Sequence, residues 1–254
     1  MPLLGATTPI SLAGALAQSA AEILAGFTMT RLLAPDVPVN LRIQLFAFDM
    51  RFSNIALGAP EEGLLARLCK ELTDFYGGLE SPNPYIFSSS KLPNQQAAVE
   101  KAVTALYKAL AGVRTFTVGG ATASGVFSPE QLVIDCEIID YVNRVMQGFE
   151  LGDPFDDLEL IQEGLTRGLY LDTDATASRH RSTFWKPHLF EHSPLRHWQE
   201  SHPEDLRART KTIVRQMIER HNYRLEPGKW QQLEAIYTEA VSRLSTPVDG
   251  KLHR

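Results

Sequence analysis

The first eighteen residues, MPLLGATTPISLAGALAQ, combine an apolar strand end, a tight turn and the start of a helix. Leu3 and Leu4 precede a turn rich in Gly, Thr and Pro, and an Ala-rich run follows at once. Thr7, Thr8 and Ser11 carry oxygens that can accept hydrogen bonds from the first free N–H groups of the helix. The stretch predicts a β–α unit whose helix start suits a carboxylate or phosphate. The alternative is an ordinary capped helix that binds nothing.

The same order of strand, loop and helix recurs downstream. Strands are expected at 39–46, 85–87 and 113–118, and helices at 11–33, 60–76, 93–111 and 128–148. Short strands joined through helices imply parallel pairing with crossover connections. Because the chain has no glycine-rich dinucleotide fingerprint or phosphate loop, the pattern favours an α/β fold of the (β/α) TIM-barrel type over a doubly wound sheet.

The alternation weakens after residue 155. A helix is expected at 155–168, a last strand at 169–171, and two charged amphipathic helices at 204–222 and 229–244. We therefore predict two parts. Residues 1–172 form a partial (β/α) barrel, and residues 173–254 form an irregular connector and C-terminal helices that pack on the barrel.

Composition narrows the class of protein. The net charge of −5 argues against a nucleic-acid partner or a polybasic membrane protein. Cys69 and Cys136 form neither a metal-binding spacing nor a disulfide framework. The most apolar stretch, residues 12–27, is interrupted by Gln18 and Glu22, which indicates a buried helix and no membrane span. These features predict a cytoplasmic protein.

Ligands of parallel α/β folds bind at the carboxyl ends of the strands. That rule selects four loops, at residues 5–11, 46–52, 87–91 and 119–127. All seven histidines lie at or after His180, outside these loops. We therefore expect neither a histidine base nor a metal site there.

The loop at 46–52 has an unusual composition, FAFDMRF. Phe46, Phe48 and Phe52 surround Asp49, and aromatic faces beside a carboxylate can hold a quaternary ammonium with about 0.5–2 kcal/mol per ring. The alternative is that the three rings belong to the core and that Asp49 pairs with Arg51 or caps a turn.

An ordered set of short motifs resembles the trimethylamine methyltransferase family over roughly residues 1–200. The set comprises Gly5-Ala6-Thr7-Thr8-Pro9, Asp49-Met50-Arg51, Gly58-Ala59-Pro60-Glu61, Ser90-Lys91, and the run from Ser128 to Asp135. The resemblance implies a TIM barrel that moves a methyl group from a methylated amine to the cobalt of a separate corrinoid protein. Because no pyrrolysine is written here, the chain resembles the branch that uses quaternary amines such as glycine betaine.

The resemblance also implies roles for residues of the four loops. The three phenylalanines would cage the cation, Asp49 would balance its charge, and Arg51 or the first helix start would take a substrate carboxylate. The full set of expected substrate-binding residues is Thr8, Ser11, Phe46, Phe48, Asp49, Arg51, Phe52, Ser90, Lys91 and Ser124. No catalytic residue is assigned. When a quaternary amine loses a methyl group, the leaving group is a neutral amine, so no general base is needed. No cofactor is expected to bind directly, because the partner protein supplies the corrinoid.

Two departures from the family keep other functions open. Met1 falls near the middle of family members, which predicts an incomplete barrel completed by a second copy or a separate chain. Ser89 and Cys136 stand where family members often carry acidic residues, and Tyr170 lies where they place a Gly-Gly-His segment. A non-catalytic binding or assembly subunit that keeps the amine pocket is therefore an alternative. A fragment that folds as an oligomer without a specific activity is another.

Overall fold

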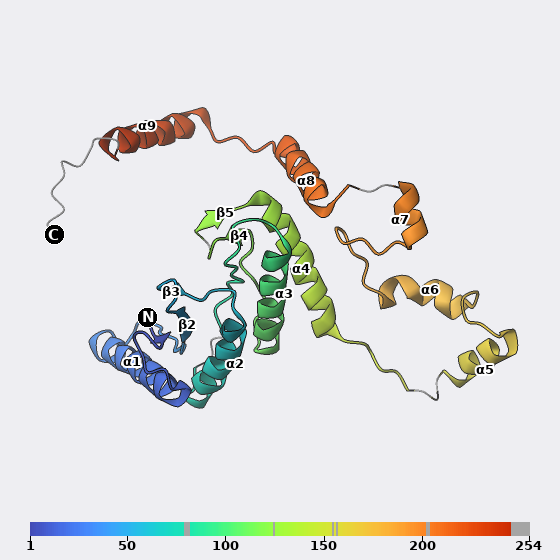
Figure 1. Cartoon of the computed structure of the whole chain (residues 1–254), viewed down its shortest axis with the longest axis horizontal. Coiled ribbons are helices and arrows are strands. Elements are labelled where there is room, and N and C mark those ends of the chain that lie inside the picture. Colours follow the sequence, from blue (N-terminus) through green and yellow to red (C-terminus); the bar gives the residue numbers. More distant parts are fainter. Residues whose placement is uncertain (79–81, 124, 154, 156, 202–203, 245–254) are drawn as a thin grey trace. The chain divides into compact units, whose positions relative to one another are not determined.

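The computed structural model describes residues 1–244 except 79–81, 124, 154, 156 and 202–203 (Figure 1). The chain divides into two compact units, Met1–Val214 and Arg215–Arg254. The described residues are mostly helical with a few short strands, a mixed α/β composition. The first part contains β1 (Leu3–Leu4), α1 (Leu12–Leu33), β2 (Phe46–Asp49), β3 (Asn54–Ile55), α2 (Pro60–Phe75), α3 (Gln95–Leu110), β4 (Gly120–Ala121), β5 (Val126–Phe127) and α4 (Pro129–Gln147). It is followed by α5 (Leu158–Arg167), α6 (Asp174–Thr183), α7 (Leu195–Ser201), α8 (Leu206–Arg220) and α9 (Pro227–Leu244).

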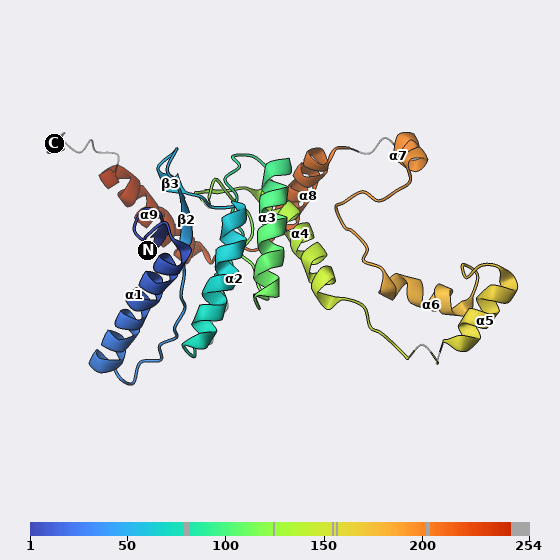
Figure 2. The ribbon, with the colours of Figure 1, turned by 60° about the horizontal axis from the view of Figure 1, so that its bottom comes forward.

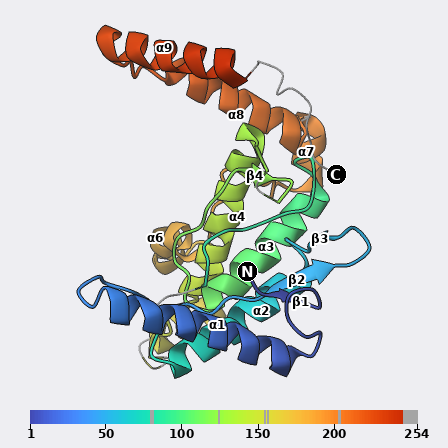
Figure 3. The same ribbon diagram turned by 90° about the vertical axis from the view of Figure 1, so that its left-hand side faces the viewer.

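The longer-range strand pairings are parallel. β1 pairs with β2 across α1, with Leu3 opposite Phe46, and β3 lies antiparallel on the other side of β2 (Figure 3). Further along, Tyr85 and Thr117 form a parallel bridge across α3. Both parallel contacts therefore join segments separated by a helix, as crossover units require. β4 and β5 form an antiparallel hairpin just before α4.

The predicted helices are confirmed to within a few residues at their ends. Asn94 caps α3 by accepting a hydrogen bond from Ala97 N at 3.0 Å, and Ser128 caps α4 by accepting from Gln131 N at 3.2 Å. The predicted capping of α1 is wrong. Ser11 makes no side-chain cap bond, and the Thr8 hydroxyl instead donates to Leu3 O at 3.0 Å.

The strand predictions need correction in the described part of the chain. The expected strand at 39–46 begins its ladder only at Phe46 and continues to Asp49. Leu41, Ile43 and Leu45 are nevertheless all buried, so the alternation marks which side chains face the core. The segments expected as strands at 85–87 and 113–118 keep the single bridge described above. A ladder needs a partner in register, and alternation within one segment does not report on that.

The last expected strand, at 169–171, is wrong. Gly168 ends α5 with φ +78°, a left-handed conformation that favours glycine. The chain then turns back, and the Tyr170 hydroxyl donates to Ile161 O of α5 at 3.4 Å. The triplet thus lies in a turn beside its own preceding helix, and Leu169, Tyr170 and Leu171 are all exposed.

Three apolar clusters hold the first unit together. The largest joins α1 and α2 to the segment before β2 and contains Ala15, Ala20, Leu41, Ile43, Leu45, Leu65 and Cys69. The second joins α3 and α4 through Ala105, Ala109 and Val142, and the third joins α4 to Leu189. α2, α3 and α4 consequently lie side by side (Figure 2).

α1 differs from the buried helix that the sequence predicted. Its length and apolar composition would suit a membrane span. One face packs on the largest cluster through Leu16 and Ile23, whereas Met29, Leu32 and Leu33 on its last turns are exposed. The helix is therefore packed on one side only within the described residues.

Candidate functional site

Two of the four selected loops contact one another directly. Thr122 N donates to Ser90 O at 2.9 Å, and Ala123 N donates to Ser88 O at 2.8 Å. Ser89 Oγ also donates to Leu57 O, in the segment that leads from β3 to α2, at 2.6 Å. The loops at 87–91 and 119–127 and the segment after β3 thus form one continuous edge, which we call the loop edge.

The loop edge stores backbone strain. Thr122 and Ala123 have φ values of +50° and +54°. This left-handed conformation is unfavourable for a β-branched residue and costs about 1–3 kcal/mol for each strained residue. The hydrogen bonds from both residues to the neighbouring loop hold the conformation. Strain of this kind concentrates in loops that bind ligands, so it marks this edge as the candidate site.

Glu100 of α3 holds the loop at residues 87–91, which we call the serine loop, through hydrogen bonds. Its carboxylate accepts a hydrogen bond from Ser88 Oγ at 2.7 Å and another from Ser89 N at 2.9 Å. Gly58 approaches the same carboxylate, and a Cβ there would lie 2.8 Å from Glu100 Oε2 and 2.9 Å from Ser88 Cα. Gly58 also has φ +79°, so only glycine fits at this crossing.

A buried ion pair fixes the start of the loop at 119–127. Lys101 Nζ donates to Asp135 at 2.6 Å, and both side chains are fully buried. The same carboxylate accepts from Gly119 N and from Gln131 Nε2, each at 2.7 Å. Burial raises the pKa of Asp135, and the Lys101 ammonium opposes that shift.

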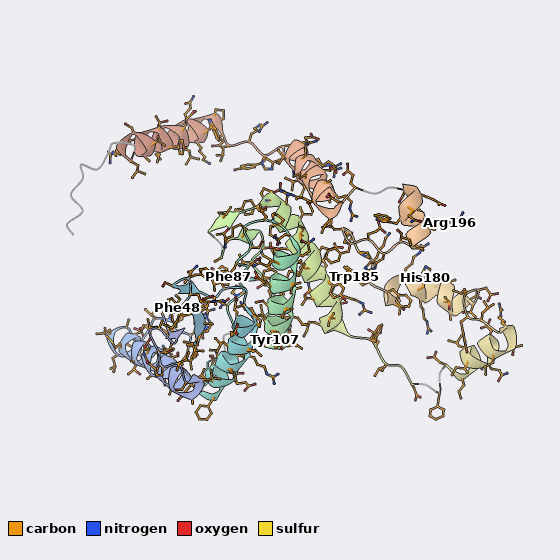
Figure 4. The ribbon with its side chains drawn as sticks, in the orientation of Figure 1. Phe48, Phe87, Tyr107, His180, Trp185 and Arg196 are labelled. Carbon is orange, nitrogen blue, oxygen red and sulfur yellow. The ribbon has the colours of Figure 1, made fainter. Side chains whose placement is uncertain are left out.

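A second buried ion pair fixes the segment before α2. Lys108 Nζ donates to Glu62 at 2.6 Å, and Glu62 accepts from Gly58 N at 2.8 Å. Burial lowers the pKa of Lys108, and the Glu62 carboxylate opposes that shift. The ammonium also lies 5.7 Å from the centre of the Phe87 ring, at the end of the third predicted strand (Figure 4).

The sequence-based prediction missed both ion pairs. Lys101 and Lys108 lie seven residues apart on the face of α3 that carries buried Ala97, Ala105 and Ala109. A lysine on a buried helix face needs a carboxylate partner, because an unpaired buried charge is too costly. The two lysines on this alanine-rich helix face are therefore the feature of the sequence from which the ion pairs could have been predicted.

In the loop at 46–52 the ion pair of the alternative arrangement is observed, whereas its burial of all three rings in the core is not. Asp49 pairs with Arg51 through two side-chain hydrogen bonds of 2.6 and 3.0 Å, and the guanidinium holds the pKa of Asp49 below its usual range. Arg51 also lies over the Phe52 ring, which is 78 % exposed. Phe46 and Phe48 are half-buried on β2 (Figure 4). A cation that binds Asp49 would have to displace the Arg51 guanidinium or share the Asp49 carboxylate with it.

The remaining predicted site residues are dispersed. Thr8 is buried in the turn after β1, and Ser11 is exposed at the start of α1. Ser90 is buried, and its hydroxyl donates to Asn94 Oδ1 at 2.9 Å, whereas Lys91 is exposed and donates to Ser89 O at 2.6 Å. Ser124 lies outside the described residues. Of the predicted set, the structure therefore brings Ser90 and Lys91 to the loop edge.

Chemically, these loops supply charge and aromatic faces. Asp49 and Arg51 present opposite charges side by side, whereas the hydroxyls of Ser88, Ser89 and Ser90 all donate to acceptors within the protein. The four loops contain neither histidine nor cysteine. Such groups can orient a small charged molecule, whereas they offer no side chain that exchanges protons near neutral pH.

Comparison with known sequences identifies the family. The model of the trimethylamine methyltransferase family matches residues 1–239. The chain belongs to this family. A trimethylamine methyltransferase of Methanosarcina mazei is 33 % identical over 224 residues, which cover 87 % of this chain and 44 % of that protein.

Two further relatives illustrate the range of the family. A trimethylamine methyltransferase of Methanosarcina thermophila is 37 % identical over 64 % of this chain and 34 % of its own length. A glycine betaine methyltransferase of Desulfitobacterium hafniense is 29 % identical over 98 % of this chain and 48 % of its own length. The chain thus spans half or less of the length of the curated relatives that it matches.

Proposed function

We propose that this chain acts in the transfer of a methyl group from a quaternary amine, such as glycine betaine, to a corrinoid protein. The observation that carries the proposal is the family match over residues 1–239. The relative that covers most of the chain is named for glycine betaine, a quaternary amine. The acceptor, a cytoplasmic location and the choice of amine are parts of the proposal.

The fold that we propose is part of a (β/α) TIM barrel. The parallel pairing of β1 with β2 and the parallel bridge between Tyr85 and Thr117 are what such a barrel requires. Residues 1–172 supply these strands and their helices. A second copy, or polypeptide outside this sequence, supplies the remaining strands and closes the open sheet edges.

The Asp49–Arg51 pair suits a zwitterionic substrate. Glycine betaine carries a trimethylammonium and a carboxylate separated by one methylene group. The ammonium would approach Asp49 and the faces of Phe46, Phe48 and Phe52, while its carboxylate would pair with Arg51. In the structure the two side chains pair with each other at 2.6 Å. Of the other predicted residues, Lys91 is exposed at the loop edge and is proposed to line the rest of the site.

The proposed chemistry needs positioning more than proton transfer. The C–N bond breaks, its electron pair stays on nitrogen, and dimethylglycine leaves as a carboxylate with a neutral tertiary amine. The corrinoid of the partner protein would supply the nucleophile that accepts the methyl group. The residues of this chain would hold the amine in line with that acceptor and exclude water, which lowers the barrier by fixing the reacting geometry.

A methyl-transfer assay tests this function. The purified chain is incubated with glycine betaine and reduced cobalamin, and methylcobalamin and dimethylglycine are measured together. We expect equal amounts of both products, and a loss of about tenfold or more in Asp49→Ala. Glu71→Ala, an exposed carboxylate on α2, is the matched control and keeps full activity. Product formation that is unchanged in Asp49→Ala would remove that residue from the site.

A non-catalytic binding subunit is the second candidate. It is favoured by Ser89, whose hydroxyl is committed to Leu57 O at 2.6 Å and which stands where family members often carry an acid. Calorimetry separates the two functions. A chain that binds betaine but yields no dimethylglycine with any corrinoid acceptor is a binding subunit, and a chain that does neither contradicts both proposals.

A further inference from the structure

Helix α9 exposes a continuous apolar face. Within its own unit, Arg215–Arg254, it contains no buried residue, and Trp230, Ile236, Tyr237 and Leu244 are 58 %, 63 %, 71 % and 84 % exposed. Polar residues such as Gln231 and Thr238 occupy the opposite side. An amphipathic helix that exposes its apolar face is a docking surface for another helix.

The apolar residues of α9 follow a heptad. Trp230, Tyr237 and Leu244 repeat every seven residues at position a, and Leu233 and Ala240 occupy position d. This spacing is the pattern of a coiled-coil seam, in which each side chain inserts between residues of a facing helix. The small Ala240 leaves space for the neighbouring tyrosine rings.

The flanking residues determine which helix fits the seam. In a parallel pair, each g residue faces the e residue five positions later on the other helix. Lys229 at g would then face Glu234 of a second copy, and Ile236 would face Val241. An antiparallel pair would instead bring Lys229 to Arg243 of the other helix, which places like charges together.

We propose that α9 pairs in parallel with α9 of a second copy of this chain. The charge match between Lys229 and Glu234 and the apolar match between Ile236 and Val241 both arise only in that register. Each copy presents the same face, so the contact closes on itself with two-fold symmetry. This proposal is independent of the methyl-transfer function and is tested without substrate.

Cysteine cross-linking tests the seam. In a Cys136→Ser background, Ala240→Cys places a thiol at position d, where the two copies meet in the same layer. Ala235→Cys, on the opposite side of the same helix, is the matched control. Under mild oxidation we expect a disulfide-linked dimer from Ala240→Cys and monomer from Ala235→Cys. Equal cross-linking at both positions, or none at Ala240→Cys, overturns the proposal.

Charge reversal tests the register and orientation. Sedimentation equilibrium of the full chain should show a monomer–dimer equilibrium, weakened about three- to tenfold by Lys229→Glu and by Glu234→Lys. The double reversal should restore it. Residues five apart do not face each other on one helix, so rescue reports a contact between copies. A chain that stays monomeric at every concentration, or a double variant as weak as the single ones, overturns the proposal.

Discussion

At the scale of single residues, two buried lysines of α3 connect the helices to the loops. Lys101 and Lys108 each pair with a carboxylate at 2.6 Å, and each carboxylate also accepts a glycine N–H group of a loop. Two charges in a dry interior are stabilising only while all partners are present. These pairs therefore hold Gly58 and Gly119, the backbone positions from which the loop edge begins.

The first prediction is that Asp135→Asn destabilises the protein by about 3–5 kcal/mol, because it leaves the Lys101 ammonium buried without a counter-charge. Replacing both partners, Lys101→Met with Asp135→Leu, should be less harmful than the single change. Urea unfolding followed by circular dichroism measures both. Arg67→Ala, which breaks an exposed pair with Glu71, is the control and should cost less than about 1 kcal/mol. A loss in Asp135→Asn no larger than this control would contradict the argument.

The second prediction concerns the buried thiol Cys69. Burial raises its pKa from 9.0 to about 12, so the folded state keeps the proton that the unfolded state loses. This stabilisation is fully present below about pH 9 and is lost as the pH rises toward 12, with a limit of about 4 kcal/mol. The urea midpoint should therefore fall more steeply over this range in the wild type than in Cys69→Ala. Parallel curves for the two proteins would show that the thiol contributes nothing.

At the scale of elements, one carboxylate docks the connector onto α4. Glu137 Oε1 accepts from the backbone N–H groups of His188, Leu189 and Phe190, at 2.9 to 3.0 Å. Three N–H donors around one carboxylate form an anion nest, and here the anion comes from the protein itself. Leu189 is buried beside Ile134 and Ile138 in the same contact.

The third prediction is that Glu137→Gln loosens this segment. The amide oxygen is a neutral and weaker acceptor, which should remove about 1–3 kcal/mol from the contact. Amide hydrogen exchange of residues 188–190 should accelerate about tenfold or more, while exchange in α2 stays unchanged. Asp140→Asn, exposed on the same helix, is the matched control. Uniform acceleration across the chain would instead indicate general destabilisation.

Helices were more predictable than strands for a physical reason. The caps at Asn94 and Ser128 are local signals, and the helices that follow them begin where the sequence indicates. A strand depends on a partner distant in the sequence, so the alternation of Leu41, Ile43 and Leu45 gave burial correctly and the ladder only from Phe46. The hydroxyl of Thr8 misled because it can bond either a helix start or a strand end.

Only part of the candidate site was predictable in the same sense. The four loops were selected by the rule on strand ends, and two of them are in direct contact. The strained backbone at Thr122 and the support from Glu100 depend on tertiary contacts, which no local pattern contains. The sequence around Asp49 was compatible both with binding a cation and with pairing to Arg51. The structure shows the ion pair, because Arg51 lies only two residues away.

At the scale of the whole molecule, the strands in the described residues leave sheet edges unpaired. β1 pairs on one side with β2, and β4 pairs only with β5 in the described residues. The expected barrel of residues 1–172 and the packing of residues 173–254 on it stay predictions. The chain spans half or less of the length of these curated relatives, and the closure of a barrel by further strands stays part of the proposal.

The fourth prediction rests on the proposed function: glycine betaine should stabilise the chain against heat. A ligand that binds only the folded state at a hundred times its Kd adds about 2.7 kcal/mol, which raises Tm by roughly 5–10 °C for a protein of this size. The control ligand is 3,3-dimethylbutyrate, which keeps the shape and the carboxylate but replaces the ammonium nitrogen by carbon. It can pair with Arg51 and touch the rings, but it gains no charge attraction from Asp49 or from the ring faces, so its shift should be much smaller. In Asp49→Asn the Tm shifts caused by the two ligands should become more alike, because the carboxylate that favours the ammonium is gone. Equal shifts in the wild-type chain would mean that the site, if it binds betaine, recognises only the carboxylate.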